Sequence, residues 1–176
     1  MAYVEIPKLN IYMPVYHGTD EGVLQIAAGH LPGSSLPVGG ENTHSLISGH
    51  RGLPSAKLFT DIDKLKKGDL FFIHVFDEVL AYKVNQIKIV LPDDVETLEI
   101  EKGKDYVTLI TCTPYGVNSH RLLVRGERTV YKQSESKIED MIKKNNLKYI
   151  MLTAGVILAL IGMTVLVSVF LIKRRK

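Results

Sequence analysis

The stretch TLITCTPYGVNSHRLLVRG, from Thr108 to Gly126, contains two apolar runs separated by a segment rich in turn-forming residues. The first run ends at Cys112, the only cysteine in the 176 residues, and the second begins near Arg121. Pro114 cannot donate a hydrogen bond to a strand neighbour, so the first strand should end just beyond Cys112. The sequence therefore predicts two strands, with residues 113–120 forming the loop between them.

Side chains alternate between the two faces of a strand. In the first run this alternation groups Cys112 with Thr108 and Ile110, and in the second it groups Arg121 with Leu123. If the two strands pair antiparallel, the end of the first lies beside the start of the second. Cys112 and Arg121 are therefore expected at the same end of the hairpin, and on a common face if the register permits.

The rest of the first 130 residues favours short strands over helices. Further strands are expected over 6–16, 44–48, 69–76 and 78–90, and the second run above should extend to residue 131. Helical patches are expected only over 20–28 and 57–65, with a turn near 92–97. Many short strands separated by Gly and Pro indicate a mainly β protein, either a sandwich or a closed barrel.

The C-terminal part has a different composition. Residues 149–172, YIMLTAGVILALIGMTVLVSVFLI, contain no charged side chain. At ~1.5 Å per residue, a helix of this length can cross a ~30 Å hydrocarbon layer. We expect a folded domain over 1–133, a polar spacer over 134–148, a transmembrane helix over 149–172 and a basic tail over 173–176.

Charge distribution gives the expected orientation. The net charge of +3 is one less than the +4 of the last four residues, so the rest of the chain carries −1. The pI of 8.9 therefore does not indicate nucleic-acid binding. The positive-inside tendency favours a cytoplasmic tail and an extracellular domain. The first residues lack the apolar core of an export signal, so the native start is expected upstream of Met1. A tail-anchored cytoplasmic protein is the alternative.

Cys112 is a candidate nucleophile. A single cysteine cannot form an intramolecular disulfide, and an ordinary thiol, with a pKa near ~8.5, is only slightly ionised at neutral pH. A nearby cation such as the Arg121 guanidinium would favour the thiolate and could stabilise an oxyanion. Acyl transfer would also need a group that protonates a leaving amine, for which histidine is suited.

His50 is the preferred histidine among the six in the chain. It directly follows the strand expected at 44–48 and lies between Gly49 and Gly52, which allow the backbone to approach a cleft closely. His120 is the main rival, although alternation would point it away from the face of its neighbour Arg121.

The remaining histidines suit other places in the predicted fold. One lies at the opposite end of the same strand, one in the middle of a strand and two in turn-like or helix-end segments where a solvated side chain is expected: His44, His74, His17 and His30, respectively.

Each candidate also has an ordinary structural explanation. A lone cysteine is often a small buried apolar residue, a glycine-flanked histidine is often a solvated loop residue, and an arginine at a strand start is often a surface charge. One cysteine and six scattered histidines show none of the paired spacings of zinc sites, so no metal or other cofactor is expected.

Two segments resemble those of a known family. TLITCTPYGVNSHRLLVRG is similar to the active-site segment of class C sortases, the pilus-assembling transpeptidases of Gram-positive bacteria. Residues 30–73, from HLPGSS to DLFFI, are similar to the family's histidine segment, and the resemblance spans nearly all of 3–131. It implies a closed sortase-type β-barrel of about eight strands, with Cys112 as nucleophile, His50 as general acid/base and Arg121 holding substrate and oxyanion.

The resemblance also implies a reaction and its partners. A cysteine transpeptidase of this kind cleaves an LPXTG-like sorting signal after threonine, forms a thioacyl-enzyme on Cys112 and transfers the acyl group to a pilin lysine. The expected partners are pilin subunits and, through 149–172, the lipid bilayer. A strip of apolar barrel surface should receive the Leu-Pro part of the signal. The expected location is the cell membrane, with the catalytic domain outside.

One family feature is missing from the sequence. Pilin-type sortases commonly carry an upstream lid with an Asp-Pro-aromatic motif, and the 176 residues contain no Asp-Pro pair. Any lid is therefore expected to precede Met1, which would leave Cys112 accessible.

Three other functions stay open from the sequence. One is a membrane-displayed β-barrel binding module with an inert buried cysteine, and another is a sortase that acts mainly in cell-wall anchoring. The third is a papain-type hydrolase, which the pattern argues against because that family places its cysteine at a helix start.

Overall fold

The computed structural model describes residues 1–53, 58–94 and 98–130. Eight strands lie within these residues: β1 (Ala2–Ile6), β2 (Ile11–His17), β3 (Ala28–His30), β4 (Thr43–Ser48), β5 (Leu70–Val75), β6 (Glu78–Val90), β7 (Asp105–Thr113) and β8 (His120–Arg128). The described helical elements are short: the 3₁₀ turns η1 (Pro7–Leu9) and η2 (Ile62–Lys64), and the helix α1 (Glu21–Leu24).

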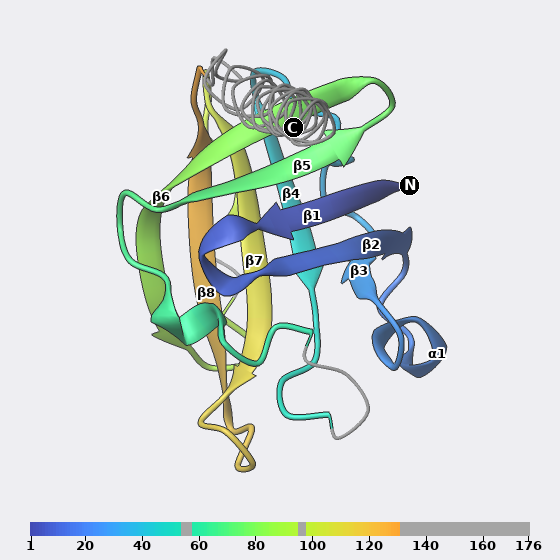
Figure 1. Cartoon of the computed structure of the whole chain (residues 1–176). Helices are drawn as coiled ribbons and strands as arrows, with labels where there is room; N and C mark the ends of the chain where they lie inside the picture. The colour runs from blue at the N-terminus through green and yellow to red at the C-terminus, as the bar shows by residue number, and fades with distance from the viewer. Residues whose placement is uncertain (54–57, 95–97, 131–176) are drawn as a thin grey trace, which may run out of the picture. The chain divides into compact units, whose positions relative to one another are not determined.

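The strands close into a barrel in the order β1-β2-β3-β4-β7-β8-β6-β5 (Figure 1), with β5 pairing back to β1. Two pairs are parallel, β2 with β3 and β4 with β7, and the other pairs are antiparallel. The predicted mainly β fold, closed as a barrel of about eight strands, is confirmed. The main hydrophobic core includes the fully buried side chains of Val4, Ile47, Phe71, Leu109 and Val124.

The stretch 6–16, expected to be one strand, is two. Pro7 has no N–H to donate and begins the 3₁₀ turn η1, and Asn10 follows with a left-handed φ of 53°. The chain reverses there, so that Ile6 pairs with Ile11 and β1 runs antiparallel to β2.

Strand β3 was not expected, and the helix predicted over 20–28 is wrong beyond α1. Asp20 caps α1 by accepting a hydrogen bond from the Val23 N–H, but the helix ends after four residues. The following segment joins the barrel as β3, between β2 and β4. Three residues are too few to show strand alternation in the sequence.

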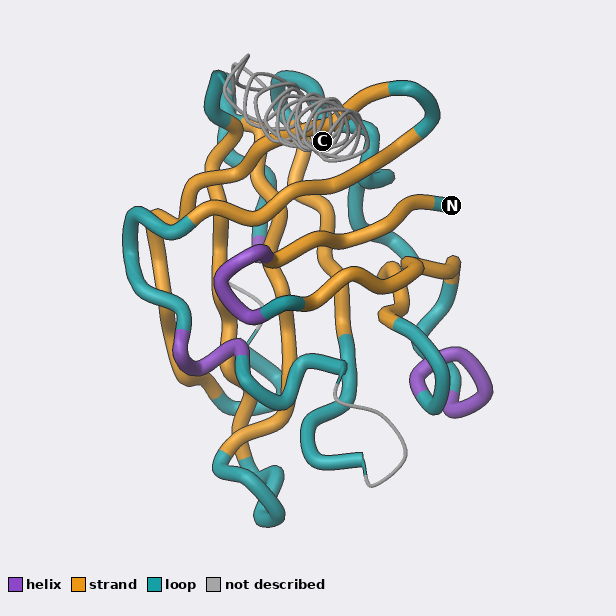
Figure 2. Tube along the Cα trace, in the orientation of Figure 1, coloured by secondary structure: helices purple, strands orange, loops and turns teal. Residues whose placement is uncertain are grey.

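Two other predicted boundaries change. The helix expected over 57–65 is wrong in its described part, which forms turns and the short η2 (Figure 2). The loop expected over 113–120 is shorter than predicted, because Thr113 and His120 pair as the last residues of the β7–β8 ladder.

The spacer, membrane helix and basic tail predicted over 134–148, 149–172 and 173–176 lie outside the described residues. Within the described ranges, none of the helices has the length and apolar character needed to span a bilayer.

Candidate active site

Cys112 and Arg121 are directly opposite each other in the β7–β8 ladder. Opposed residues of an antiparallel pair project from the same face, with Cβ atoms about 4.5–5.5 Å apart. Cys112 is partly exposed, and the Arg121 guanidinium is oriented by donating from Nη1 to the main-chain oxygens of Asn118 and His120, each at 3.2 Å. The predicted placement of the two residues on one face is therefore confirmed.

The chain that leaves β4 continues alongside β7. The two strands are parallel, with Ser48 beside Ile110 as the last pair of the register. Beyond it, the Gly49 N–H donates to the Ile110 carbonyl at 3.0 Å, and the Thr111 hydroxyl donates to the Gly49 carbonyl at 2.7 Å. These two contacts hold Gly49 against Ile110 and Thr111 at the end of β7.

Arg51 fixes the same segment one residue beyond His50. Its Nη1 donates to the Thr113 hydroxyl at 3.2 Å, and its Nη2 forms an ion pair with Asp63 at 2.6 Å. Gly49 contacts Thr111 and Arg51 contacts Thr113, so His50, which lies between them in the chain, is held beside the end of β7 that carries Cys112. The geometry thus brings the three predicted residues to one end of three adjacent strands, β4, β7 and β8.

The His50 side chain is 29% exposed, and its Nε2 lies 3.5 Å from a carboxylate oxygen of Glu21. Its carbonyl accepts a hydrogen bond from the Phe59 N–H at 3.1 Å. The Phe59 ring packs so closely on Gly49 that a Cβ at position 49 would lie 2.6 Å from a ring carbon. Glycine is therefore required next to His50 for steric reasons.

An apolar groove lies beside this site on the outer face of the barrel. Four buried side chains form a second hydrophobic cluster there, Leu46, Val90, Ile110 and Leu123. The groove has a volume of about 210 Å³ and is lined by Leu31, Ser48, Val90, Leu91, Pro92, Asp94, Leu98, Ile110, Arg121 and Leu123. Because Arg121 belongs to the lining, the groove leads to the end of the barrel that carries Cys112.

His44 lies at the opposite end of β4 from His50, as expected, and is buried. Its Nδ1 lies 2.9 Å from the Glu99 carbonyl, and its Nε2 lies 2.7 Å from the Thr108 hydroxyl. This pattern fits a neutral ring that donates from Nδ1 and accepts at Nε2. Burial lowers the pKa of His44, against the opposing effect of the Glu99 carbonyl.

The expectation of solvated, turn-like positions is wrong for His30 on both points, whereas His17 is exposed as expected but lies in a strand. His17 ends β2 and His30 ends β3, and the two rings stack with centroids 5.4 Å apart. His30 is only 1% exposed because β3 inserts between two neighbours. His74 lies within β5, as expected, and contacts Glu5 at 2.6 Å.

His120, the rival to His50, begins β8 and pairs with Thr113. It is adjacent to Arg121 in the same strand, so the two side chains project to opposite faces. Its Nδ1 lies 2.9 Å from the hydroxyl of Ser119. The alternation argument that favoured His50 therefore applies in the structure.

Sequence reasoning missed Arg51 and Glu21 as neighbours of the site. The Arg51 side chain is only 10% exposed, and its guanidinium lies 5.9 Å from the centre of the Tyr115 ring, in the β7–β8 loop. Arg51 could have been identified from the sequence by its position directly after His50. Glu21 is distant in sequence and belongs to a four-residue helix, so no spacing pointed to it.

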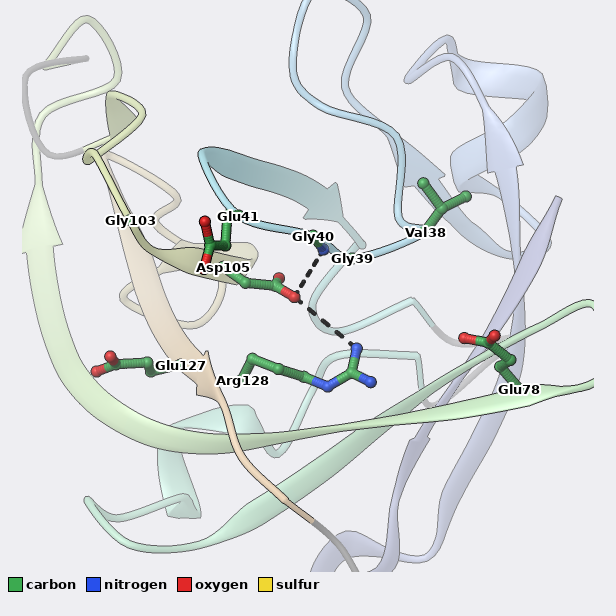
Figure 3. A pocket seen from close by; sticks show the side chains of 9 residues that line it. All are labelled: Val38, Gly39, Gly40, Glu41, Glu78, Gly103, Asp105, Glu127 and Arg128. Atoms are coloured by element: carbon green, nitrogen blue, oxygen red, sulfur yellow. Dashed lines mark hydrogen bonds and ion pairs between the residues drawn. The ribbon is translucent and has the colours of Figure 1, made fainter.

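A second hollow lies at the start of β7, at the far end of that strand from Cys112 (Figure 3). It measures about 500 Å³ and is lined by Val38, Gly39, Gly40, Glu41, Glu78, Gly103, Asp105, Glu127 and Arg128. Asp105 is fully engaged there: it accepts hydrogen bonds from the Gly40 N–H at 2.8 Å and the Tyr82 hydroxyl at 2.9 Å, and Arg128 lies 3.8 Å away. These contacts identify Asp105 as a structural anchor of the loop before β4.

The acidic side chains of this hollow do not form a metal centre. Within the ranges that the structure describes, no group of three or more His, Cys, Asp or Glu side chains is arranged to hold a metal ion. Burial, reinforced by the Asp105 carboxylate, raises the pKa of Tyr82, so this hydroxyl remains protonated and keeps donating to Asp105.

Comparison with known proteins agrees with the fold and the motifs. A family model for the sortase domain matches residues 4–129. The chain is similar to the crystal structure of sortase C1 from Streptococcus agalactiae, with 61% identity, a TM-score of 0.74, and coverage of 75% of this chain and 68% of that one. It is also similar to sortase C of Streptococcus pneumoniae, with 60% identity, a TM-score of 0.73, and coverage of 74% and 68%.

Among curated relatives, sortase D of Bacillus subtilis is 31% identical over 128 residues, and sortase A of Streptococcus agalactiae is 29% identical over 149 residues. The matches cover 71% and 83% of this chain. The chain spans 62% and 60% of the lengths of these relatives. From the family match over 4–129 and the likeness to sortase C structures, we conclude that this chain belongs to the sortase family and that its domain is of the class C type.

Proposed function

We propose that the domain is a cysteine transpeptidase that cleaves an LPXTG-like sorting signal after threonine and passes the acyl fragment to an amine. The observation that carries this proposal is the convergence of Cys112, Arg121 and His50 at one end of β7, β8 and β4. Membership of the sortase family supports the same reaction class.

In the first step, the Cys112 thiolate attacks the threonine carbonyl of the signal. The oxygen of that carbonyl becomes negatively charged, and Arg121, on the same face, is placed to stabilise it. The C–N bond then breaks, and His50 protonates the departing amine. The product is a thioester between Cys112 and the threonine residue.

In the second step His50 accepts a proton instead of donating one. An incoming amine attacks the thioester carbonyl, Arg121 again stabilises the oxyanion, and the C–S bond breaks with its electron pair remaining on sulfur. His50 accepts a proton from the attacking nitrogen. Water in place of the amine would only hydrolyse the intermediate.

The apolar groove is the proposed site for the Leu-Pro part of the signal. Its aliphatic lining suits side chains of that kind, and Arg121 at its border would leave the scissile carbonyl near Cys112. Burying a leucine side chain in such a groove contributes about 1.5–3 kcal/mol, enough to select an apolar residue at this position.

We also propose that the acceptor amine belongs to a lysine of a pilin subunit, so that the enzyme polymerises pili through isopeptide bonds. Likeness to sortase C structures supports it, and the Streptococcus pneumoniae enzyme has been described in terms of its pilin substrate specificity. We further propose that 149–172 anchors the protein in the cell membrane, with the domain on the extracellular face.

Incubation with pilin subunits that carry both a sorting signal and an acceptor lysine tests the function. Isopeptide-linked ladders on a denaturing gel, absent with Cys112→Ala, are expected. Cleaved subunits without ladders would restrict the activity to hydrolysis. Transfer to cell-wall amines without pilin ladders would favour the anchoring alternative. Ladders that persist with Cys112→Ala would remove Cys112 from the reaction, and the absence of cleavage and transfer with the unmodified protein would leave the binding-module interpretation.

A further inference from the structure

Glu21 places a carboxylate directly beside His50. It is the first residue of α1, its side chain is 71% exposed, and its Oε2 lies 3.5 Å from His50 Nε2. Its other oxygen accepts a hydrogen bond from the Gln25 side chain, one helical turn later. Asp20 caps the helix through the Val23 N–H, so the short helix holds Glu21 in place.

The barrel order puts Glu21 on the side of His50 that faces away from Cys112. α1 contacts β3, and the next strands are β4, β7 and β8 (Figure 1). Across this end of the barrel the segments that carry these residues therefore follow in the order Glu21, His50, Cys112 and Arg121. Glu21 is not among the residues that line the apolar groove.

In the second step of the proposed reaction, the acceptor amine has to be bound and deprotonated close to His50. A lysine amine has a pKa near ~10.4 and arrives as an ammonium ion at neutral pH. Two protons must leave nitrogen as the C–N bond forms and the C–S bond breaks. One goes to neutral His50 and the other to solvent, while Cys112 leaves as the thiolate. A carboxylate beside His50 collects the ammonium where His50 can take a proton from it, and the neutral amine then passes His50 to reach the thioester on Cys112.

We propose, on the basis of the proposed function, that Glu21 binds the cationic amine of the acceptor substrate. The acyl donor then occupies the apolar groove, and the acceptor approaches from the α1 side. Glu21 would act on the amine and not on the thioester, so it should favour transfer over hydrolysis, in which the nucleophile is uncharged water.

The variant Glu21→Gln removes the negative charge of the side chain at position 21. It keeps the size of that side chain and an oxygen that can accept the hydrogen bond from Gln25. The purified protein is supplied with an LPXTG-like peptide and one of two nucleophiles: a lysine-bearing peptide, which is cationic, or hydroxylamine, which is uncharged at neutral pH. Glu41→Gln is the matched control, because it removes the same charge from an exposed residue in the loop before β4, at the opposite end of that strand from His50.

For Glu21→Gln we expect the KM for the lysine peptide to rise about threefold to fivefold, the range that an exposed ion pair supports. The KM for hydroxylamine and the rate of thioester formation should not change, and Glu41→Gln should match the unmodified enzyme in every assay. The effect should fade at high salt, because an exposed pair is screened.

An equal loss with both nucleophiles, or slower thioester formation, would overturn the proposal and make Glu21 a residue that positions His50. An unchanged KM for the lysine peptide would also overturn it. A thioester that never forms on Cys112 in the unmodified enzyme would instead reject the proposed function, and with it the role of Glu21; mass spectrometry of the enzyme separates this result from the others.

Discussion

Cys112 and Arg121 face each other across the β7–β8 ladder, one at the end of its strand and the other at the start of the next. Their relative position is therefore set by strand register and not by the conformation of the loop between them. A change of register by one residue would move one of the two side chains to the opposite face. The ladder that positions these residues is continuous with the barrel core, which includes Leu109 and Val124.

The first prediction concerns the shape of the Arg121 side chain. Arg121→Ala should lower kcat/KM for transpeptidation by about 10²–10³, the usual cost of removing an oxyanion donor. Arg121→Lys should recover only part of the activity, because an ammonium lacks the planar set of donors of guanidinium. Steady-state kinetics on folded variants measures both. More than half of the activity in Arg121→Ala would contradict this role.

Steric substitutions at two glycines separate stability from activity. Gly49→Ala would push a Cβ against Phe59, and Gly126→Ala would push one to 2.5 Å from a carbon of the Phe71 ring. Each should lower the free energy of unfolding by about 1–3 kcal/mol, as overpacking does. Under conditions where both variants are folded, only Gly49→Ala should also slow thioester formation, because position 49 directly precedes His50.

Chemical denaturation, followed by thioester kinetics below the unfolding transition, checks the glycine pair. Equal activity of the two variants would show that displacement at position 49 does not reach His50.

The buried His44 predicts a pH dependence of stability. Burial lowers its pKa in the folded protein, so between that value and the ordinary ~6.5 the unfolded chain binds more protons than the folded one. The free energy of unfolding should therefore fall as the pH drops below ~6.5, by at most about 1.4 kcal/mol per pH unit from this residue. His44→Gln should show a shallower fall, measured by denaturant titration from pH 7 to pH 5. An identical pH dependence of the unfolding free energy in the two proteins would show that His44 does not cause the fall.

A substitution in the groove should affect the acyl donor alone. Leu31 is partly buried against the outer cluster, and Leu31→Ala removes apolar surface from the groove. We expect the KM for an LPXTG-like peptide to rise about tenfold, consistent with the partial loss of a leucine contact. The rate of Cys112 alkylation by a small thiol reagent should stay the same. Val130→Ala, which changes a 92% exposed side chain, is the control.

A residue of the site is easier to predict from the sequence when its partners are close to it along the chain. Alternation within two neighbouring strands was enough to place Cys112 and Arg121 on one face, because a hairpin is local. His50 follows a strand that lies more than fifty positions earlier in the chain, and its flanking glycines and the family resemblance identified it. Glu21 depends on β3 inserting next to β4, a pairing of three residues that no periodicity revealed.

The barrel itself was predictable for similar reasons. Long strands such as β6 and β7 show clear patterns, and their number indicated a closed sheet or sandwich. The parallel pairing of β4 with β7 was not visible from either strand alone, because it joins segments that are distant in sequence. That pairing is what brings the residues after Ser48 alongside the end of β7.

The most direct test of the account is mass spectrometry of the protein after brief incubation with an LPXTG-like peptide. A thioester that links the peptide's threonine carbonyl to Cys112, present in the unmodified enzyme and absent from Cys112→Ala, is the predicted result. An unmodified Cys112 while the peptide is nonetheless cleaved, or an adduct on any other residue, would contradict it.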